Sequence, residues 1–456
     1  MVSQTRNEPP GISGRPSGGA PAEIRRLPLA FWGLRAGQDG LELAGQAVSS
    51  LADRFGTPCY LFDETRLRRN IRDACRAAQA ALRGADLHYS FKTNPVPRVA
   101  AIAREEGLGA EVISGRELRA ALAAGFAAER VIFNGPGKRD ADLAFAVEHG
   151  VLVQVESASE ARALARIAAD GRRARAGLRI NPDAYDPRAN AATRMGARAS
   201  VFGMDPASAE FDEAVTVLSA ADRVTIESVS ACIGTGIIDT APFARMARAL
   251  ADVRARLAAR GIEIRTLDGG GGFAVPSEVR YADGGVDALA AGNPVALPAP
   301  DEIATFAEVC RAIAAELGPE PPERLVLEPG RLLVADAFHL VARVIRLKES
   351  GGQRFAILDA GRTQNAMFVA RGHHEMVLVR EPDAPHDARY TVVGPLCASF
   401  DTYAHGRALP ELQESDLIAV LDVGAYNLSA QSRWCFEPAP VVALADGGAS
   451  LVPTHA

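Results

Sequence analysis

Residues 151–169 of the chain, VLVQVESASEARALARIAA, join a short apolar run to an amphipathic segment. The run Val151 to Val155 is typical of a buried strand, and Glu156 to Ala169 carries apolar residues at helical spacing. The same alternation extends from about residue 57 to about residue 335. Repeated strand–helix units of this kind predict a parallel sheet.

Seven further apolar runs accompany this one. They are Leu87 to Phe91, Glu111 to Ile113, Val131 to Phe133, Ala176 to Ile180, Ile226 to Ala231, Ile264 to Leu267 and Leu325 to Leu327. Between them we expect helices, among others Arg116 to Ala124 and Phe243 to Arg260. Eight units with no obvious sheet edge predict a (β/α)8 barrel of the TIM type over residues 57–335.

The pattern changes after about residue 336, where polar turns separate β-like segments. These segments are Phe338 to Leu347, Arg354 to Leu358, Glu375 to Val379, Arg389 to Val393, Asp416 to Leu421 and Val441 to Leu444. They predict a second, mostly β domain over 336–456, which residues 28–56 join. Residues 1–27 are expected to form a disordered tail. The long connections at about 183–200 and 276–298 are expected to be functional lids or disordered.

Composition narrows the class of protein. The chain has 456 residues, 48% of them apolar, and a net charge of -6, which argues against a nucleic-acid binder. It has no apolar run of about 18 residues, so no membrane span is expected. Its six cysteines form no CxxC or Cys/His cluster, so no metal site is predicted. The scattered cysteines and the absence of a signal-peptide pattern suggest a cytoplasmic protein.

Lys92 follows the first predicted barrel strand, in Tyr89-Ser-Phe-Lys-Thr-Asn94. Barrel enzymes place their sites at the C-terminal ends of the strands, so this position is a candidate. Burial would lower the pKa of the lysine and leave its amine free to attack a carbonyl. The alternative is a lysine that enters solvent at the end of a strand.

Two more strand ends carry residues suited to binding a cofactor. Asp268-Gly-Gly-Gly-Gly-Phe273 offers backbone N–H groups to a phosphate, although a glycine run can also be a flexible turn. Glu328-Pro-Gly-Arg331 offers a carboxylate that could hold a pyridine nitrogen protonated. The alternative for Glu328 is a turn with a surface ion pair.

Eight short motifs, taken in chain order, resemble the fold-type III pyridoxal-phosphate (PLP) decarboxylases. This family includes diaminopimelate, ornithine and arginine decarboxylases. The motifs are Tyr89 to Asn94, Glu111 to Leu118, Arg179-Ile-Asn-Pro182, Gly234-Thr-Gly236, Asp268 to Phe273, Glu328 to Arg331, Val393-Gly-Pro-Leu-Cys397 and Gly424-Ala-Tyr426. Each motif is short, but the ordered set is highly specific and spans about residues 57–445.

The resemblance implies a PLP cofactor with Lys92 as its Schiff-base lysine and Glu328 at the pyridine nitrogen. Cys397 is the implied proton donor after carbon dioxide leaves; without its motif, it would be a small buried hydrophobe. Family members are usually head-to-tail homodimers in which the partner's cysteine loop completes each site. The further cofactor-binding residues implied are Cys232, Thr235, Gly271, Gly272, Gly330, Arg331 and Tyr426.

The chain departs from the family pattern around the ring and the substrate. Cys232 stands where a histidine usually stacks on the PLP ring. Ala398 replaces the acid that reads the distal amine of the substrate. Met367 and Arg371 fall where an arginine and a tyrosine read the distal carboxylate of diaminopimelate. The candidate substrate residues that remain are Asp359, Arg371 and Asp401.

These features predict PLP-dependent decarboxylation of an amino acid other than meso-diaminopimelate, such as a specialised or conjugated amino acid. An amino-acid racemase is one alternative, but racemases of this fold usually place arginine where this chain has Glu328. A non-catalytic relative that acts through a protein partner is another, but such proteins typically lose the lysine, the cysteine or the phosphate glycines. A plain phosphate-binding barrel would explain Asp268 to Phe273 but not Glu328 or Cys397.

Overall fold

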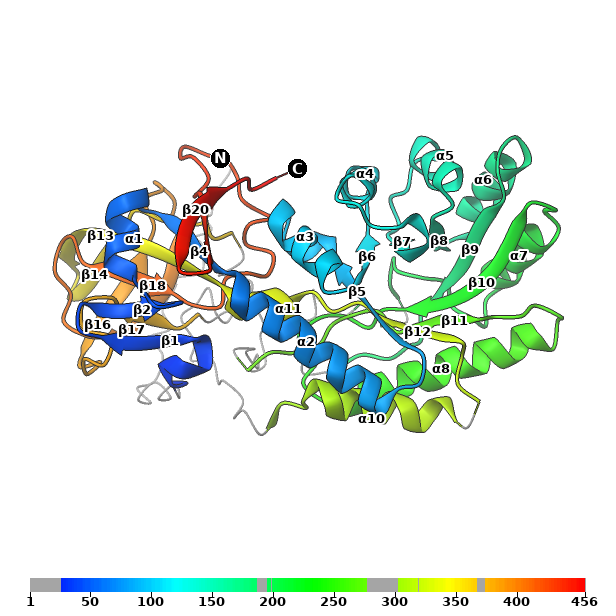
Figure 1. Cartoon of the computed structure of the whole chain (residues 1–456), viewed down its shortest axis with the longest axis horizontal. Helices are drawn as coiled ribbons and strands as arrows, with labels where there is room; N and C mark the ends of the chain where they lie inside the picture. Colours follow the sequence, from blue (N-terminus) through cyan, green and yellow to red (C-terminus); the bar gives the residue numbers. More distant parts are fainter. Residues whose placement is uncertain are drawn as a thin grey trace, which may run out of the picture.

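The computed structural model describes residues 26–186, 195–197, 199–276, 302–318, 320–366 and 374–455. Residues 1–25 of the predicted tail, half of the connection at 183–200 and nearly all of the connection at 276–298 lie outside these residues, as do Met367 and Arg371. Figure 1 shows two parts side by side, a barrel ringed by helices and a smaller, mostly β part.

The first part is a closed barrel of parallel strands in the order β10-β11-β12-β5-β6-β7-β8-β9. Each of the eight predicted apolar runs forms one of these strands, so the predicted (β/α)8 barrel is confirmed. Several strands are buried at every residue, as parallel strands covered on both faces should be. The strands are β5 (Ala85–Ser90), β6 (Gly109–Val112), β7 (Val131–Phe133), β8 (Leu152–Val155), β9 (Ala174–Ile180), β10 (Val224–Ala231), β11 (Thr266–Asp268) and β12 (Arg324–Leu327).

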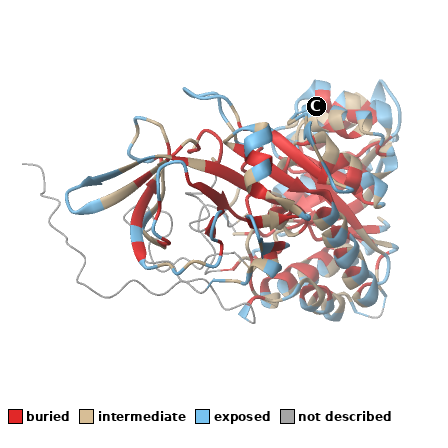
Figure 2. Ribbon diagram, turned by 60° about the vertical axis from the view of Figure 1, so that its left-hand side comes forward, coloured by how far each residue is buried: buried red, intermediate tan, exposed pale blue. Residues whose placement is uncertain are grey.

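Amphipathic helices cover the barrel, with one face buried and the other exposed (Figure 2). Side chains cap several of them: Asp63 accepts from the N–H of Arg66, and Thr305 forms a capping box with Glu308. The helices are α2 (Glu64–Ala81), α3 (Pro97–Glu105), α4 (Gly115–Ala123), α5 (Asp140–His149), α6 (Ala158–Ala169), α7 (Ala209–Ser219), α8 (Thr240–Ala258), α10 (Phe306–Leu317) and the short α11 (Arg331–Val334).

The second part is built around a nine-stranded sheet. All six predicted β segments form strands in it. The sequence did not predict β17 and β20, because neither carries an apolar run: β17 is mostly half-buried, and β20 is exposed or half-buried throughout. The strands after the barrel are β13 (Phe338–Ser350), β14 (Gln353–Leu358), β15 (Met376–Leu378), β16 (Ala388–Val393), β17 (Thr402–Leu409), β18 (Leu417–Val420), β19 (Val441–Ala445) and β20 (Gly448–Val452).

Strand β4 (Cys59–Asp63) also lies in this sheet, where it pairs with β13 and β19. The predicted boundary at residue 57 placed it with the barrel. The observed sheet differs from the predicted one because the wholly buried residues of β4 indicate a strand but do not indicate which strands it pairs with.

The N-terminal segment packs against the same sheet. It forms β1 (Leu34–Gly37), β2 (Gly40–Leu43), β3 (Gln46–Ala47) and α1 (Val48–Phe55). Trp32 and Leu41 share a buried cluster with Val341 and Val377, and the N–H of Leu41 donates to the carbonyl of Val379 at 2.7 Å.

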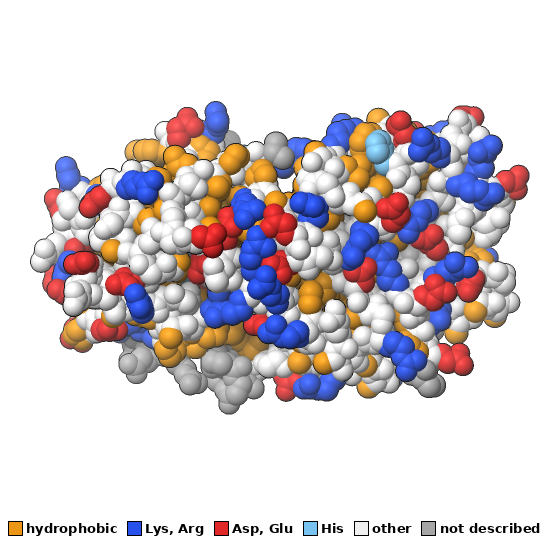
Figure 3. All heavy atoms as spheres, viewed as in Figure 1, with side chains coloured by type: hydrophobic (Ala, Val, Ile, Leu, Met, Phe, Trp, Pro, Cys, Tyr) orange, Lys and Arg blue, Asp and Glu red, His pale blue; other side chains and the backbone are white. Residues whose placement is uncertain are grey.

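The surface in Figure 3 intermixes basic and acidic side chains. Within the described residues, no helix is both long and apolar enough to span a membrane. The same residues contain no group of three or more His, Cys, Asp or Glu side chains arranged to hold a metal ion.

Candidate active site

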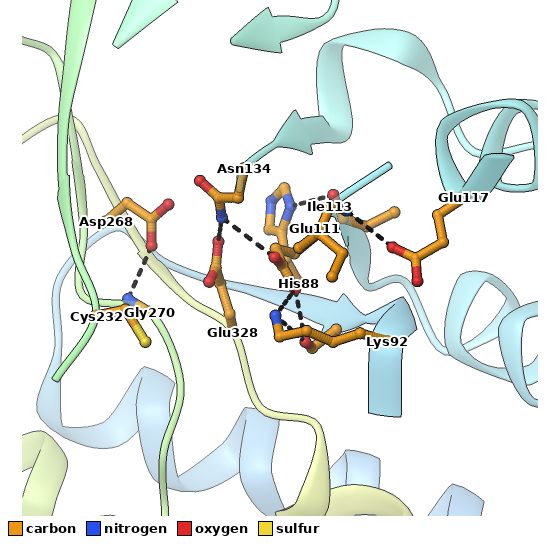
Figure 4. Close-up of polar contacts among 12 residues, drawn as sticks. His88, Lys92, Glu111, Ile113, Glu117, Asn134, Cys232, Asp268, Gly270 and Glu328 are labelled. Atoms are coloured by element: carbon orange, nitrogen blue, oxygen red, sulfur yellow. Dashed lines mark hydrogen bonds and ion pairs between the residues drawn. The ribbon is translucent and has the colours of Figure 1, made fainter. Parts of the chain in front are cut away.

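Polar side chains converge where the barrel strands end (Figure 4). Lys92 lies in the 3-10 turn Phe91–Thr93, directly after β5. Glu111 lies near the end of β6, and Asn134 directly follows β7. On the other side, Asp268 ends β11 and Glu328 directly follows β12. This is the face of a (β/α)8 barrel on which active sites are found.

Lys92 is held by a buried carboxylate. Its Nζ donates to Glu111 Oε2 at 2.5 Å and to Ser90 Oγ at 2.8 Å, and the Ser90 hydroxyl donates to the same Glu111 oxygen at 2.6 Å. Burial acts to lower the pKa of Lys92, but the charges of Glu111, Tyr426 and Glu328 outweigh it and raise that pKa. The prediction of a lowered lysine pKa is therefore wrong, because it did not foresee the carboxylate of Glu111.

A second carboxyl group, Glu328, lies across the site. Asn134 Nδ2 donates to Glu328 Oε1 at 2.7 Å. Asp268 lies nearby, and its Oδ1 accepts from the N–H of Gly270 at 2.9 Å. Burial, followed by the charges of Asp268 and Glu111, raises the pKa of Glu328 well above its ordinary value. Glu328 therefore holds a proton tightly unless a cation is placed beside it.

Three of the predicted glycines occupy positions that leave no room for a side chain. A Cβ at Gly271 would lie 2.5 Å from the carbonyl oxygen of Glu328, and one at Gly330 would lie 2.0 Å from the hydroxyl oxygen of Thr93. Gly272 has a φ of 100°, and its Cβ would lie 2.4 Å from the carbonyl oxygen of Gly234. These positions let the backbone come close to a ligand.

Arg331 and Tyr426 lie together near the lysine. The guanidinium of Arg331, which is buried, sits 5.1 Å from the centre of the Tyr426 ring. The backbone N–H of Tyr426 donates to the carbonyl of Thr93 at 2.7 Å, and the Ser429 hydroxyl donates to the carbonyl of Lys92 at 2.8 Å. The segment that holds Tyr426 therefore contacts the lysine turn directly.

The loop after β10 holds two more predicted residues. Thr235 is half-buried between Gly234 and Gly236. Cys232 directly follows the strand, and a Cβ at Gly270 would lie 3.2 Å from the Cβ of Cys232. Cys232 is thus a neighbour of the glycine run.

Cys397 is exposed on the loop between β16 and β17. Asp401, on the same loop, is buried, and its carboxylate accepts from the N–H groups of Arg362 at 2.6 Å and Leu396 at 2.8 Å. Asp401, predicted as a substrate residue, therefore holds its own loop in place.

Asp359, the other acid predicted to contact substrate, is also engaged. Its carboxylate accepts from the Thr57 hydroxyl at 2.6 Å and from the N–H of Arg343 at 2.8 Å. The third predicted substrate residue, Arg371, lies outside the described residues.

Sequence reasoning gave no role to Ser90, Glu111 or Asn134. All three lie at or directly after the end of a barrel strand, and that position was the available signal. Their hydrogen bonds to Lys92 and Glu328 depend on which strands are neighbours in the barrel, which the sequence alone does not state.

Comparison with known proteins gives the class to which this site belongs. Residues 68–335 match the family model "Pyridoxal-dependent decarboxylase, pyridoxal binding domain". The chain belongs to this family: it is a PLP-dependent carboxy-lyase, and pyridoxal 5'-phosphate is its cofactor.

Within the family, the chain is similar to diaminopimelate decarboxylases. It is 32% identical to that of Zymomonas mobilis over 409 residues, covering 89% of this chain and 91% of the relative. It is 33% identical to that of Methanothermobacter thermautotrophicus over 414 residues, covering 90% and 91%. The solved diaminopimelate decarboxylase of M. jannaschii in complex with L-lysine superposes with a TM-score of 0.80 at 25% identity, covering 92% of this chain and 94% of that one.

The residues of the site fit this cofactor. A lysine amine can bind the aldehyde of the cofactor, and the buried carboxyl group opposite it can pair with the pyridine nitrogen. The backbone N–H groups of the glycines can bind the phosphate. Four buried polar atoms at or near the ends of barrel strands have no hydrogen-bond partner among the described residues: Thr93 Oγ1, Asn134 Oδ1, Ser230 Oγ and Asp268 Oδ2.

Proposed function

We propose that the chain decarboxylates an amino acid, with Lys92 holding the cofactor covalently and Cys397 donating the proton that replaces the lost carboxylate. The observation that carries this proposal is the pairing of Lys92 with Glu111 across from the buried Glu328. When bound, the cofactor supplies an electron sink for the bond that breaks. The chain supplies positions, charges and protons around it.

Glu111 is the group best suited to take a proton from Lys92. Its Oε2 lies 2.5 Å from the lysine Nζ, and the amine must lose a proton before it can attack a carbonyl. Ser90 steadies the same carboxylate oxygen. Glu328 would hold the ring nitrogen protonated, while Thr235, the glycine run, Gly330, Arg331 and Tyr426 would surround the phosphate.

The proposed substrate is an amino acid whose distal end is not a cation, such as a specialised or conjugated amino acid. Ala398 follows Cys397, so this position has no acid to bind a distal ammonium. On the same loop Phe400 stacks on Trp434, with ring centres 5.7 Å apart, and the guanidinium of Arg362 lies 5.2 Å from the centre of the Phe400 ring. Both rings are about half exposed. The positive charge of Arg362 disfavours an ammonium and favours an anionic group, and the two exposed rings offer a stacking surface to an aromatic one.

We further propose a homodimer with shared sites, as is usual in the family. The exposed position of Cys397 supports this arrangement, because a loop that points outward can reach a neighbouring subunit.

The test measures carbon dioxide release from the PLP-loaded protein with a panel of amino acids. The panel holds meso-diaminopimelate, L-lysine and L-ornithine beside amino acids with aromatic or acylated side chains. We expect release from the second group, and Cys397→Ala should lower kcat at least about 100-fold without loss of bound PLP, since proton transfer is removed.

Three results would contradict parts of this proposal. Efficient turnover of meso-diaminopimelate would contradict the substrate class. Full activity of Cys397→Ala would contradict the proton donor. Exchange of the Cα hydrogen with deuterated solvent, with no carbon dioxide released from any substrate, would favour the racemase.

A further inference from the structure

We propose that Asn134 is a positioning residue that stabilises the charged form of Glu328 and leaves one of its oxygens for the ring nitrogen of the cofactor. This inference rests on the proposed role of Glu328 at that nitrogen. Asn134 is not among the residues that the family resemblance singled out.

The geometry places the Asn134 amide between two carboxyl groups (Figure 4). Its Nδ2 donates to Glu328 Oε1 at 2.7 Å and lies 3.4 Å from Glu111 Oε1. The backbone is fixed as well, because the N–H of Asn134 donates to the carbonyl of Val112 at 2.8 Å. Asn134, Glu111 and Glu328 are all buried. One amide thus links the carboxylate beside the lysine to the carboxyl group across the barrel.

The charges around Glu328 explain why it needs a donor. Asp268, Glu111 and Cys232 all favour its neutral form, and only Lys92 among its largest influences favours the charged form. The nearby Arg179 is already paired with Glu156 at 2.6 Å. A carboxyl group in this setting keeps its proton unless hydrogen bonds stabilise the anion.

An uncharged donor suits this position better than a charged one. The amide N–H of Asn134 stabilises the carboxylate of Glu328 through Oε1 and does not occupy Oε2. A lysine or arginine here would compete with the ring nitrogen for Glu328. An aspartate would add a further negative charge beside Glu111 and Asp268. Asn134 therefore does what neither a cation nor an anion could do at this point of the barrel.

The test is a double-mutant cycle on the dissociation constant of PLP in the full chain. The four proteins are the wild type, Asn134→Leu, Glu328→Gln and the double variant. Leucine keeps the approximate volume of asparagine without its donors. We expect Asn134→Leu to weaken PLP binding about tenfold, the effect of one hydrogen bond to a charged group. In the Glu328→Gln background the same change should have almost no effect, because no carboxylate is left to stabilise.

The pH dependence supplies a readout that a purely structural role would not change. Loss of the donor raises the pKa of Glu328 in the complex, so its protonation on acidification should release PLP at a pH about one unit higher than in the wild type. The matched control is Gln154→Leu, which removes a buried barrel amide that donates to Ser228 at 3.0 Å. That variant should leave the pH of release unchanged. If Asn134→Leu does not fold, Asn134→Ala carries the same expectations.

Two outcomes would overturn the inference. In the first, Asn134→Leu binds PLP with the same affinity as the wild type and releases it at the same pH, whereas Glu328→Gln binds PLP weakly. The other is an equal loss of affinity from Asn134→Leu in both backgrounds. Wild-type affinity in Glu328→Gln would instead contradict the proposed role of Glu328, so the two failures are distinguishable.

Discussion

At the scale of single residues, the site sets three buried carboxyl groups around one lysine. Glu111 pairs with Lys92, and burial acts to raise the pKa of Glu111 while the lysine charge lowers it. Among the described residues neither Asp268 nor Glu328 forms such an ion pair, and burial is the first cause of the raised pKa of each. The surroundings of Glu328 therefore favour either its protonated form or the binding of a cation beside it.

This preference predicts a stability that depends on pH. The pKa of Glu328 is raised by folding, so the folded chain holds a proton that the unfolded chain releases above its ordinary pKa of 4.5. In protein without bound PLP, the contribution of Glu328 to stability falls as pH rises from that value toward the raised pKa, by up to about 1.4 kcal/mol per pH unit. Glutamine does not bind this proton. We expect Glu328→Gln to be more stable than the wild type at pH 8, with a gap that narrows toward pH 5.

Urea unfolding of the two PLP-free proteins between pH 5 and pH 8 measures this gap. Glu414→Gln, which changes an exposed carboxyl group in the same way, is the control. A wild type that is the more stable protein at pH 8, or a gap that does not vary with pH, would contradict the account.

At the scale of elements, the loop that carries Cys397 depends on one buried acid. The Asp401 carboxylate accepts from the N–H groups of Arg362 and Leu396. A Cβ at Gly361 would lie 2.6 Å, and one at Gly394 2.4 Å, from its oxygens, so the backbone closes tightly around the acid. This arrangement joins the two ends of the Cys397 loop to the segment after β14.

Removal of this acid should loosen the loop without emptying the cofactor site. In Asp401→Ala two backbone N–H groups lose their acceptor, at a local cost of about 1–3 kcal/mol. We expect faster amide hydrogen exchange over residues 394–401 and a lower kcat, with PLP absorbance unchanged. Exchange rates equal to those of the wild type in this loop would contradict the role assigned to Asp401.

Also at this scale, the sequence predicted strands better than strand partners. All eight barrel strands followed from apolar runs, because parallel strands buried on both faces are apolar at nearly every position. β4 is equally apolar, yet it pairs with β13 and β19, and no local pattern states which neighbour a buried strand selects. β17 was not predicted, because its residues TYAHGRAL are mostly half-buried and include charged and small side chains.

At the scale of the whole molecule, the candidate site joins the two parts of the chain. Asn94 Nδ2, beside the lysine turn, donates to the carbonyl of Gly424 at 2.9 Å, and the N–H of Tyr426 donates back to Thr93. A single buried apolar cluster includes residues of both parts, such as Val112 in the barrel and Val420 in the sheet. The barrel and the sheet therefore form one continuous core beside the site.

The sequence could predict which polar residues lie together at one end of the barrel but not how they are paired. Lys92, Glu328 and the glycines lie in recognisable motifs, and their positions after strands place them at one end of the barrel. The link from Glu111 through Asn134 to Glu328 joins residues up to 217 positions apart (328 − 111), and it exists only once the barrel closes. Asp359 and Asp401, which the sequence suggested as substrate residues, both accept from backbone N–H groups, and Asp359 also accepts from the Thr57 hydroxyl.

The central claim is that Lys92 holds the cofactor. The small number of lysines in the chain allows a direct test of this claim. The chain has only three lysines, Lys92, Lys138 and Lys348. The side chain of Lys138 is fully buried against Glu160, and Lys348 is exposed on β13. Reduction of the PLP-loaded protein with borohydride, followed by peptide mass spectrometry, shows which amine carries the cofactor. We predict a single pyridoxyl adduct, on the peptide that contains Lys92. The corresponding peptide of Lys92→Ala should carry no adduct. An adduct on Lys138 or Lys348, or no adduct on a protein that binds PLP, would contradict the account.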